Sequence, residues 1–147
     1  MNSYTEMHGR NILFFLISGF ICFLALSQKA HGQNQSWLTP TYLDTIKNPV
    51  LREGPEMEEA KKIYNSTCWS CHGLEGKGDG PASLQLNPKP ADHTSKNVLR
   101  QSDGALFYKI SVGKGDMQPY SKLLTVKQRW ALVNYIRSLS SDAHEIK

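Results

Sequence analysis

Apolar residues recur at helical spacing in three stretches of the chain. In residues 56–65, Met57, Ala60, Ile63 and Tyr64 fall on one face, and acidic residues stand in the first turn, where the helix dipole favours them. No repeat and no β-rich segment is present. The pattern therefore predicts an all-α domain whose first helix begins near residue 56.

A second, shorter helix is predicted from capping residues and apolar spacing. Ser102 and Asp103 can cap its N-terminus, and Gly113 ends it. Its apolar side carries Leu106, Phe107 and Ile110. We expect this side to line the interior of the domain.

The last helix begins after Thr125, the expected N-cap, with Gln128 at the capping-box position. Its broad apolar stripe consists of Ala131, Leu132, Tyr135, Ile136 and Leu139. Its other side carries Trp130, Val133, Asn134 and Arg137. We expect one broad face to be buried against the helix at residues 56–65.

Two segments lack this periodicity. Residues 73–92 are interrupted by glycines and prolines that cannot sustain a helix or a strand, so we expect a loop there. A loop of this length in a compact domain usually has a function or packs against something. Residues 33–55 contain three prolines and predict an extended N-terminal arm, which is either a linker or wraps the domain.

The N-terminus has the order of a secretory signal. The apolar run Ile12–Leu26 follows Arg10 and precedes small residues, and it is shorter than the roughly 20 residues that a membrane-spanning helix needs. We expect cleavage after Gly32, with an uncleaved membrane anchor as the alternative. Cys22 lies inside the apolar run and would leave with the signal.

Cleavage would leave about 115 of the 147 residues, which fits one small domain. The parts are then a signal peptide at 1–32, the arm at 33–55 and a domain at 56–147. The removed part carries two basic residues and one acidic residue, so the formal charge falls from +4 to +3. This charge is too small and too evenly mixed to indicate a nucleic-acid partner.

Two cysteines remain in the expected mature chain, within the stretch Cys68-Trp69-Ser70-Cys71-His72-Gly73. A structural zinc site takes four Cys or His ligands, and the second close pair is missing. A dithiol redox site of the thioredoxin type needs a preceding strand, whereas the residues before Cys68 have a helical pattern. Both alternatives are therefore disfavoured.

Haem attachment accounts for every residue of this motif. The spacing lets both thiols form thioether bonds to the two vinyl groups of one porphyrin, and His72 then lies beneath the iron as an axial ligand. The sequence therefore predicts one covalently bound haem c, attached to Cys68 and Cys71 and ligated by His72.

The chain resembles the mono-haem class I c-type cytochromes from about Met57 to Leu139. The haem motif indicates the cofactor, and the order of the other matching segments indicates the class. These segments are Ile63-Tyr64, residues 76–81 (GKGDGP), residues 88–92 (PKPAD), Met117 and residues 128–137. Four-helix-bundle cytochromes carry the motif near the C-terminus, whereas a long segment follows it here. The resemblance implies an all-α class I cytochrome c fold, with three to four helices packed around one haem.

The resemblance also implies roles for residues outside the motif. In related cytochromes a proline carbonyl accepts a hydrogen bond from the second ring nitrogen of the ligand histidine, and Pro81 is the candidate here; the other interpretation is a turn residue. Ala60 stands where the family usually has a glycine, four residues before the aromatic Tyr64, which implies a slightly wider crossing of the first and last helices.

The sixth iron ligand decides between electron transfer and catalysis. Met57 belongs to the apolar face of the first helix, His144 lies in a polar tail, and His93 is more typical of a solvated histidine. Met117 lies in a glycine-containing loop between two helices and is the favoured ligand. Gln118 separates it from the proline that follows directly in the family, and water or no ligand is the remaining option.

An iron held by His72 and Met117 has no vacant position for a substrate, so the sequence predicts a one-electron carrier and not an enzyme. One alternative is an electron-transfer subunit of a membrane respiratory complex. Another is an open-site haem enzyme or gas sensor in which Met117 is absent from the iron or displaceable. A dihaem peroxidase would need a second haem motif, and the sequence contains none.

The expected location is the periplasm or another extracytoplasmic space, with membrane contact only if the N-terminal segment stays uncleaved. The expected partners are redox proteins, a donor and an acceptor. Lys77, Lys114 and Lys122 lie in loops expected to frame the haem edge, where they would attract an acidic partner or form a solvated rim.

Overall fold

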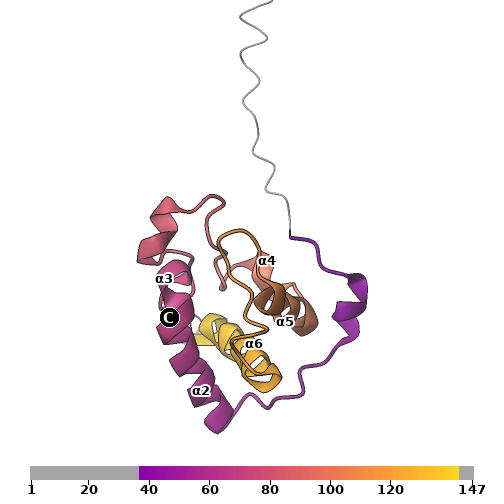
Figure 1. Ribbon diagram of the computed structural model, residues 1–147. Helices are drawn as coiled ribbons and strands as arrows, with labels where there is room; N and C mark the ends of the chain where they lie inside the picture. Colours follow the sequence, from indigo (N-terminus) through magenta and orange to yellow (C-terminus); the bar gives the residue numbers. More distant parts are fainter. Residues whose placement is uncertain (1–36, 143–147) are drawn as a thin grey trace, which may run out of the picture. The chain divides into compact units, whose positions relative to one another are not determined.

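The computed structural model describes residues 37–142, where helices and short helical turns are joined by loops and no strand occurs (Figure 1). In chain order they are η1 (Thr41–Thr45), α2 (Pro55–Ile63), η2 (Tyr64–Cys68), α3 (Trp69–His72), η3 (Pro81–Gln85), α4 (Lys96–Leu99), α5 (Asp103–Val112) and α6 (Val126–Asp142). The predicted all-α class is confirmed. The expected signal peptide and His144 lie outside the described residues. Among the helices at 37–142, none has the length and apolarity needed to cross a bilayer.

The predicted first helix continues without a break into the haem motif as α2, η2 and α3. Pro55 occupies its first turn, where the missing amide proton costs nothing, and two acidic residues complement the helix dipole there. In η2 the backbone widens into a π-turn, closed by the Trp69 amide donating to the Tyr64 carbonyl. Such turns often occur at functional sites, and no feature of the sequence pattern predicts this one.

The caps of α5 and α6 agree with the predictions. Ser102 Oγ accepts a hydrogen bond from the Ala105 amide at 3.1 Å, and Gly113 follows the last residue of α5. At the start of α6, the Thr125 amide donates to Gln128 Oε1 at 2.8 Å, and the Gln128 amide donates to Thr125 Oγ1 at 3.2 Å. This reciprocal pair is the predicted capping box.

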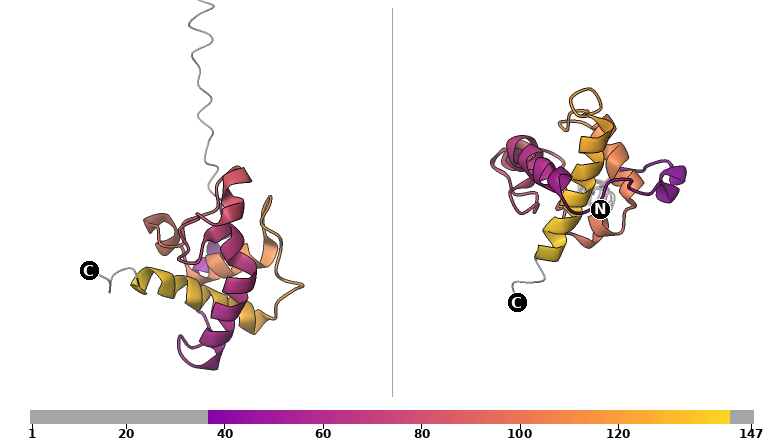
Figure 2. Two further views of the ribbon diagram at one scale, coloured as in Figure 1. Left: turned by 90° about the vertical axis from the view of Figure 1, so that its left-hand side faces the viewer. Right: turned by 90° about the horizontal axis from the view of Figure 1, so that it is seen from below.

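α6 lies between α2 and α5, as Figure 1 and the right-hand view of Figure 2 show. The ring of Tyr64 lies 5.1 Å from that of Tyr135 on one side, and Phe107 stacks on Trp130 at 4.1 Å on the other. The buried residues of α6 include Arg129, Trp130, Ala131, Leu132, Val133, Asn134, Ile136 and Leu139. The expectation of one buried face is therefore wrong, because elements pack on both sides of this helix.

The N-terminal arm packs against the domain, which answers the question that the sequence left open. Leu43 in η1 is buried, and η1 packs against α5. A Cβ atom at Gly104 would lie only 2.1 Å from the Leu43 carbonyl oxygen. The close contact of the arm with α5 therefore depends on a glycine.

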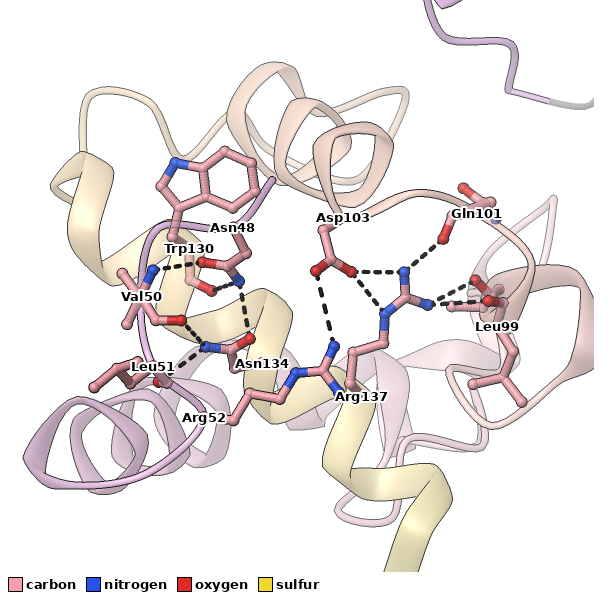
Figure 3. Close-up of polar contacts among 11 residues, drawn as sticks. Asn48, Val50, Leu51, Arg52, Leu99, Gln101, Asp103, Trp130, Asn134 and Arg137 are labelled. Atoms are coloured by element: carbon pink, nitrogen blue, oxygen red, sulfur yellow. Dashed lines mark hydrogen bonds and ion pairs between the residues drawn. The ribbon is translucent and has the colours of Figure 1, made fainter. Parts of the chain in front are cut away.

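Two asparagines fix the rest of the arm to α6 (Figure 3). Asn48 donates to the Trp130 carbonyl at 3.0 Å and to Asn134 Oδ1 at 2.9 Å. Asn134 in turn donates to the carbonyls of Val50 and Leu51 at 3.0 and 3.1 Å. Buried polar groups need such partners, so α6 and the arm are mutually dependent.

Arg137 connects α6 to the end of α4, the start of α5 and the residues between them (Figure 3). Its guanidinium donates to Asp103 Oδ1 at 2.8 and 3.0 Å, and to the carbonyls of Val98, Leu99 and Gln101. α4 has a single turn capped by Ser95, which explains why the sequence pattern did not predict it.

Candidate haem site

The two thiols of the motif lie one helical turn apart, Cys68 at the end of η2 and Cys71 in α3. Both cysteines are free and half-buried. Burial raises the pKa of the Cys68 thiol to about 12, and the neighbouring Cys71 acts in the same direction. Dithiol oxidoreductases need a reactive thiol whose pKa is lowered, and burial acts on the Cys68 thiol in the opposite direction.

His72, the last residue of α3, is oriented by a backbone carbonyl. Its Nδ1 lies 3.0 Å from the Ala91 oxygen. Because a carbonyl only accepts, Nδ1 carries a proton, and in the neutral ring Nε2 then keeps a lone pair. Burial lowers the pKa of the ring, although the bond to Ala91 opposes this effect, so the imidazole is neutral at pH 7. A neutral ring whose far nitrogen is unprotonated is the form that binds a metal.

The structure assigns the acceptor role to Ala91 and not to Pro81, so the interpretation of Pro81 as the partner of His72 is wrong. Pro81 begins η3, in agreement with the alternative interpretation as a turn residue. The preceding Gly80 donates its amide proton to the Cys71 carbonyl at 3.2 Å. A Cβ at Gly80 would lie 2.4 Å from the carbonyl oxygens of Trp69 and Ser70. The backbone directly before Pro81 therefore packs closely against α3.

The predicted loop at 73–92 folds over the C-terminal end of α3. The Gly78 amide donates to the His72 carbonyl at 2.8 Å, satisfying one of the unpaired carbonyls of the helix end. A Cβ at Gly78, where φ is +72°, would lie 2.5 Å from the Pro90 carbonyl. This close approach brings the chain at Ala91 to the imidazole. The short helix η3 is the one regular element within this loop.

His93 is buried beside His72, so the expectation of a solvated histidine is wrong. The two rings stack with centroids 4.2 Å apart and planes 19° apart. This spacing leaves no room for a porphyrin between them, so the two histidines are not opposite axial ligands of one iron. Burial lowers the pKa of His93 to about 3, and His72 contributes in the same direction.

Met117 lies in a tight turn between α5 and α6. Lys114 and Met117 exchange two backbone hydrogen bonds, of 2.8 and 3.1 Å. Gly113 and Gly115 have φ of +63° and +57°, which only glycine adopts readily. The side chain of Met117 is half-buried and packs against the same apolar cluster as Cys68. The structure therefore brings the favoured sixth ligand and the first thiol to one core.

Tyr120 is a site residue that the sequence reasoning missed. It is buried, and its amide donates to the Ile110 carbonyl at 3.1 Å, which ties the Met117 turn to α5. Burial raises the pKa of its hydroxyl, and among the smaller causes both thiols of the motif act in the same direction. An aromatic three residues after the candidate methionine was the signal that could have indicated it.

These residues fit a covalently attached haem c. Two free thiols stand one turn apart, an imidazole beside them presents an unprotonated Nε2, and a thioether packs against the same apolar cluster. Trp130 and Tyr120 belong to that cluster, and Phe107, which stacks on Trp130, packs against it. The fold and the site together define a c-type haem protein.

Comparison with known proteins gives the same class. Residues 57–140 match the sequence model of the family described as cytochrome c, and the chain belongs to this family. A chain of the Kuenenia stuttgartiensis reducing HAO-like protein complex is similar in structure, with a TM-score of 0.54 and 29% sequence identity. The likeness covers 64% of the present chain and 49% of that chain, so the present protein matches about half the length of its neighbour. No curated protein matches the sequence.

Family membership confirms the resemblance inferred from the motif and the class I cytochrome c fold. It implies covalent haem c, which Cys68, Cys71 and His72 are placed to hold. The family and the structural neighbour together support haem electron transfer as the function of this domain.

Proposed function

We propose that this protein is an exported one-electron carrier with a single haem c, attached through Cys68 and Cys71 and ligated by His72 and Met117. The observation that supports the proposal most strongly is the His72 ring, neutral and held through Nδ1 by the Ala91 carbonyl. A bound haem supplies the exchange of one electron between its ferric and ferrous states.

The residues of the chain tune that exchange. A thioether is a soft ligand that favours ferrous iron, so Met117 would raise the reduction potential. The bond from His72 to Ala91 increases the basicity of the ring and fixes its tautomer. The turn at residues 113–117 holds the methionine through the two backbone hydrogen bonds with Lys114.

Two methionine variants test the ligand assignment. Met117→Ala should lower the midpoint potential, remove the weak near-infrared band of ferric sulfur ligation and open the iron to carbon monoxide. Met57→Ala is the matched control, because Met57 is half-buried in α2, and it should keep all three properties. A wild-type protein that lacks the band and binds carbon monoxide readily would instead be the open-site enzyme or sensor.

The proposed export rests on the N-terminal sequence, with cleavage after Gly32 and a periplasmic mature chain. Sequencing the N-terminus of the protein purified from its native cells tests this proposal. A mature chain that begins near Gln33 is the expected result. A membrane-extracted chain that still contains Ile12–Leu26 would support the anchored alternative.

A second candidate function is an electron-transfer subunit of a larger oxidoreductase. The similar structure from Kuenenia stuttgartiensis is part of a protein complex, which favours this candidate. Purification from native membranes at low and high salt distinguishes the two. A free carrier elutes alone at both salt concentrations, whereas a subunit co-purifies with its partner at low salt.

A further inference from the structure

The imidazole of His93 lies flat against that of His72 on the inner side of the haem motif. The hydrogen bond from His72 Nδ1 to Ala91 restrains the ligand ring but still allows it to turn by some degrees about its Cβ–Cγ bond. A second ring at 4.2 Å and 19° removes this freedom, because turning the ligand ring would drive its edge into the neighbour.

His93 is itself held by the surrounding chain. Its backbone amide donates to the Gly76 carbonyl at 2.6 Å. A Cβ at Gly76 would lie 3.1 Å from His93 Cβ and 2.8 Å from a methyl carbon of Leu139, so glycine permits the close packing. With only 9% of its surface exposed, His93 has little space to adopt another orientation.

The ring of His93 is also oriented by a hydrogen bond to the core. Tyr64, which has no exposed surface, donates its hydroxyl proton to the Gly73 carbonyl at 3.1 Å. The same oxygen lies 3.3 Å from His93 Nδ1. Because a hydroxyl has one proton, the tyrosine oxygen accepts from Nδ1–H of His93. The contacts therefore run from α2 through Tyr64 and His93 to the face of His72.

We propose that His93 is a positioning residue that sets the plane of the His72 ring, and that Tyr64 sets the plane of His93. The inference rests on the proposed function, because it takes His72 as an iron ligand. The ring plane of an axial ligand determines how unpaired spin is distributed over a ferric porphyrin, and a sealed surface behind the ring excludes water and raises the reduction potential.

Three variants of the full-length holoprotein test this role. His93→Ala removes the stacked ring, His93→Phe keeps a flat ring without the hydrogen bond, and Tyr64→Phe removes only the hydroxyl. Ser140→Ala is the control, because Ser140 Oγ donates a hydrogen bond to the backbone carbonyl of His93, at 3.5 Å, and not to its ring. The measurements are the NMR shifts of the four haem methyl groups in the ferric state, the midpoint potential and thermal unfolding.

We expect His93→Ala to change the order or spread of the methyl shifts and to lower the potential. His93→Phe should stay closer to wild type than His93→Ala, Tyr64→Phe should give an intermediate change, and Ser140→Ala should change neither property. The proposal is overturned if His93→Ala lowers only the unfolding temperature, or if His93→Phe changes the shifts as much as His93→Ala.

The wild-type spectrum separates this proposal from the proposed function. If the wild-type protein carries no covalent haem, or its iron lacks histidine ligation, the proposed function itself fails before any variant is compared. If the wild-type protein has both and the His93 variants match it, only the positioning role fails.

Discussion

Replacing Gly113 by alanine should loosen the turn that carries Met117. Gly113 has φ +63° and ψ 176°, a conformation that is essentially restricted to glycine. A Cβ there would lie 2.3 Å from the Met117 carbonyl oxygen and 2.7 Å from the Pro119 nitrogen. Both contacts are to backbone, so the turn itself must move.

The structure gives the size of the effect. Backbone strain at such a conformation costs about 1–3 kcal/mol, and forcing an atom into a filled space adds about 1–3 kcal/mol. We therefore expect Gly113→Ala to lower the free energy of unfolding by roughly 2–6 kcal/mol. Gly115 in the same turn has φ +57° and nothing within 4 Å of its Cβ position. Gly115→Ala should cost only the left-handed strain, about 1–2 kcal/mol.

Denaturant unfolding of the ferric holoproteins measures both changes, and the near-infrared sulfur band reports the iron ligand. Gly113→Ala should be the less stable variant and should lose part of the band, because moving Met117 weakens its ligation. Gly115→Ala should keep the band. Equal stability and equal band intensity in the two variants would refute the claim that the 2.3 Å contact at Gly113 destabilises the Met117 turn.

Three further perturbations test other parts of the account. Burial raises the pKa of Tyr64, so above about pH 10 the unfolded chain releases a proton that the folded chain keeps; stability should fall with rising pH by up to about 1.4 kcal/mol per unit, and less in Tyr64→Phe. If the free energy of unfolding, measured by chemical denaturation, fell equally with pH in the wild type and in Tyr64→Phe, Tyr64 would not be the cause. Asn48→Ala should cost about 1–3 kcal/mol in denaturant unfolding, because its acceptors on α6 lose their donor; an unchanged midpoint would show that the arm is not fixed there. If charge steers the redox partner, electron-transfer rates should fall as salt rises, and Lys122→Glu should slow transfer more than Lys77→Glu, since Lys77 is already paired with Glu75 at 2.6 Å. A flat salt profile would favour a pre-docked subunit.

The local sequence was sufficient to predict the helix ends that are marked by capping residues. Ser102 and the pair of Thr125 and Gln128 were predictable because each bonds a backbone group within three residues. The haem motif was predictable for the same reason, since its spacing alone sets the geometry of the thiols. The burial of α6 was underestimated because α5 and the arm, which lies some 80 residues away in sequence, also pack against it.

The environment of His72 could not be predicted from local rules. Its partner Ala91 lies 19 residues along the chain, at the end of a loop whose path depends on close glycine contacts. The stacking of His93 follows from the same path, because the loop brings both residues to the ring together. A sequence pattern identifies such a loop but does not show which of its carbonyls lies next to the imidazole. Ala91 could therefore not be predicted in place of Pro81 as the hydrogen-bond acceptor of His72.

The intact mass of the mature protein, purified from a host that attaches haem c, tests the central claim most directly. The account predicts a chain shortened at its N-terminus and heavier by one haem, which denaturation does not remove. Cys68→Ala combined with Cys71→Ala should abolish this added mass. A wild-type mass equal to the bare chain, or to a chain carrying zinc or a disulfide instead of haem, would contradict it.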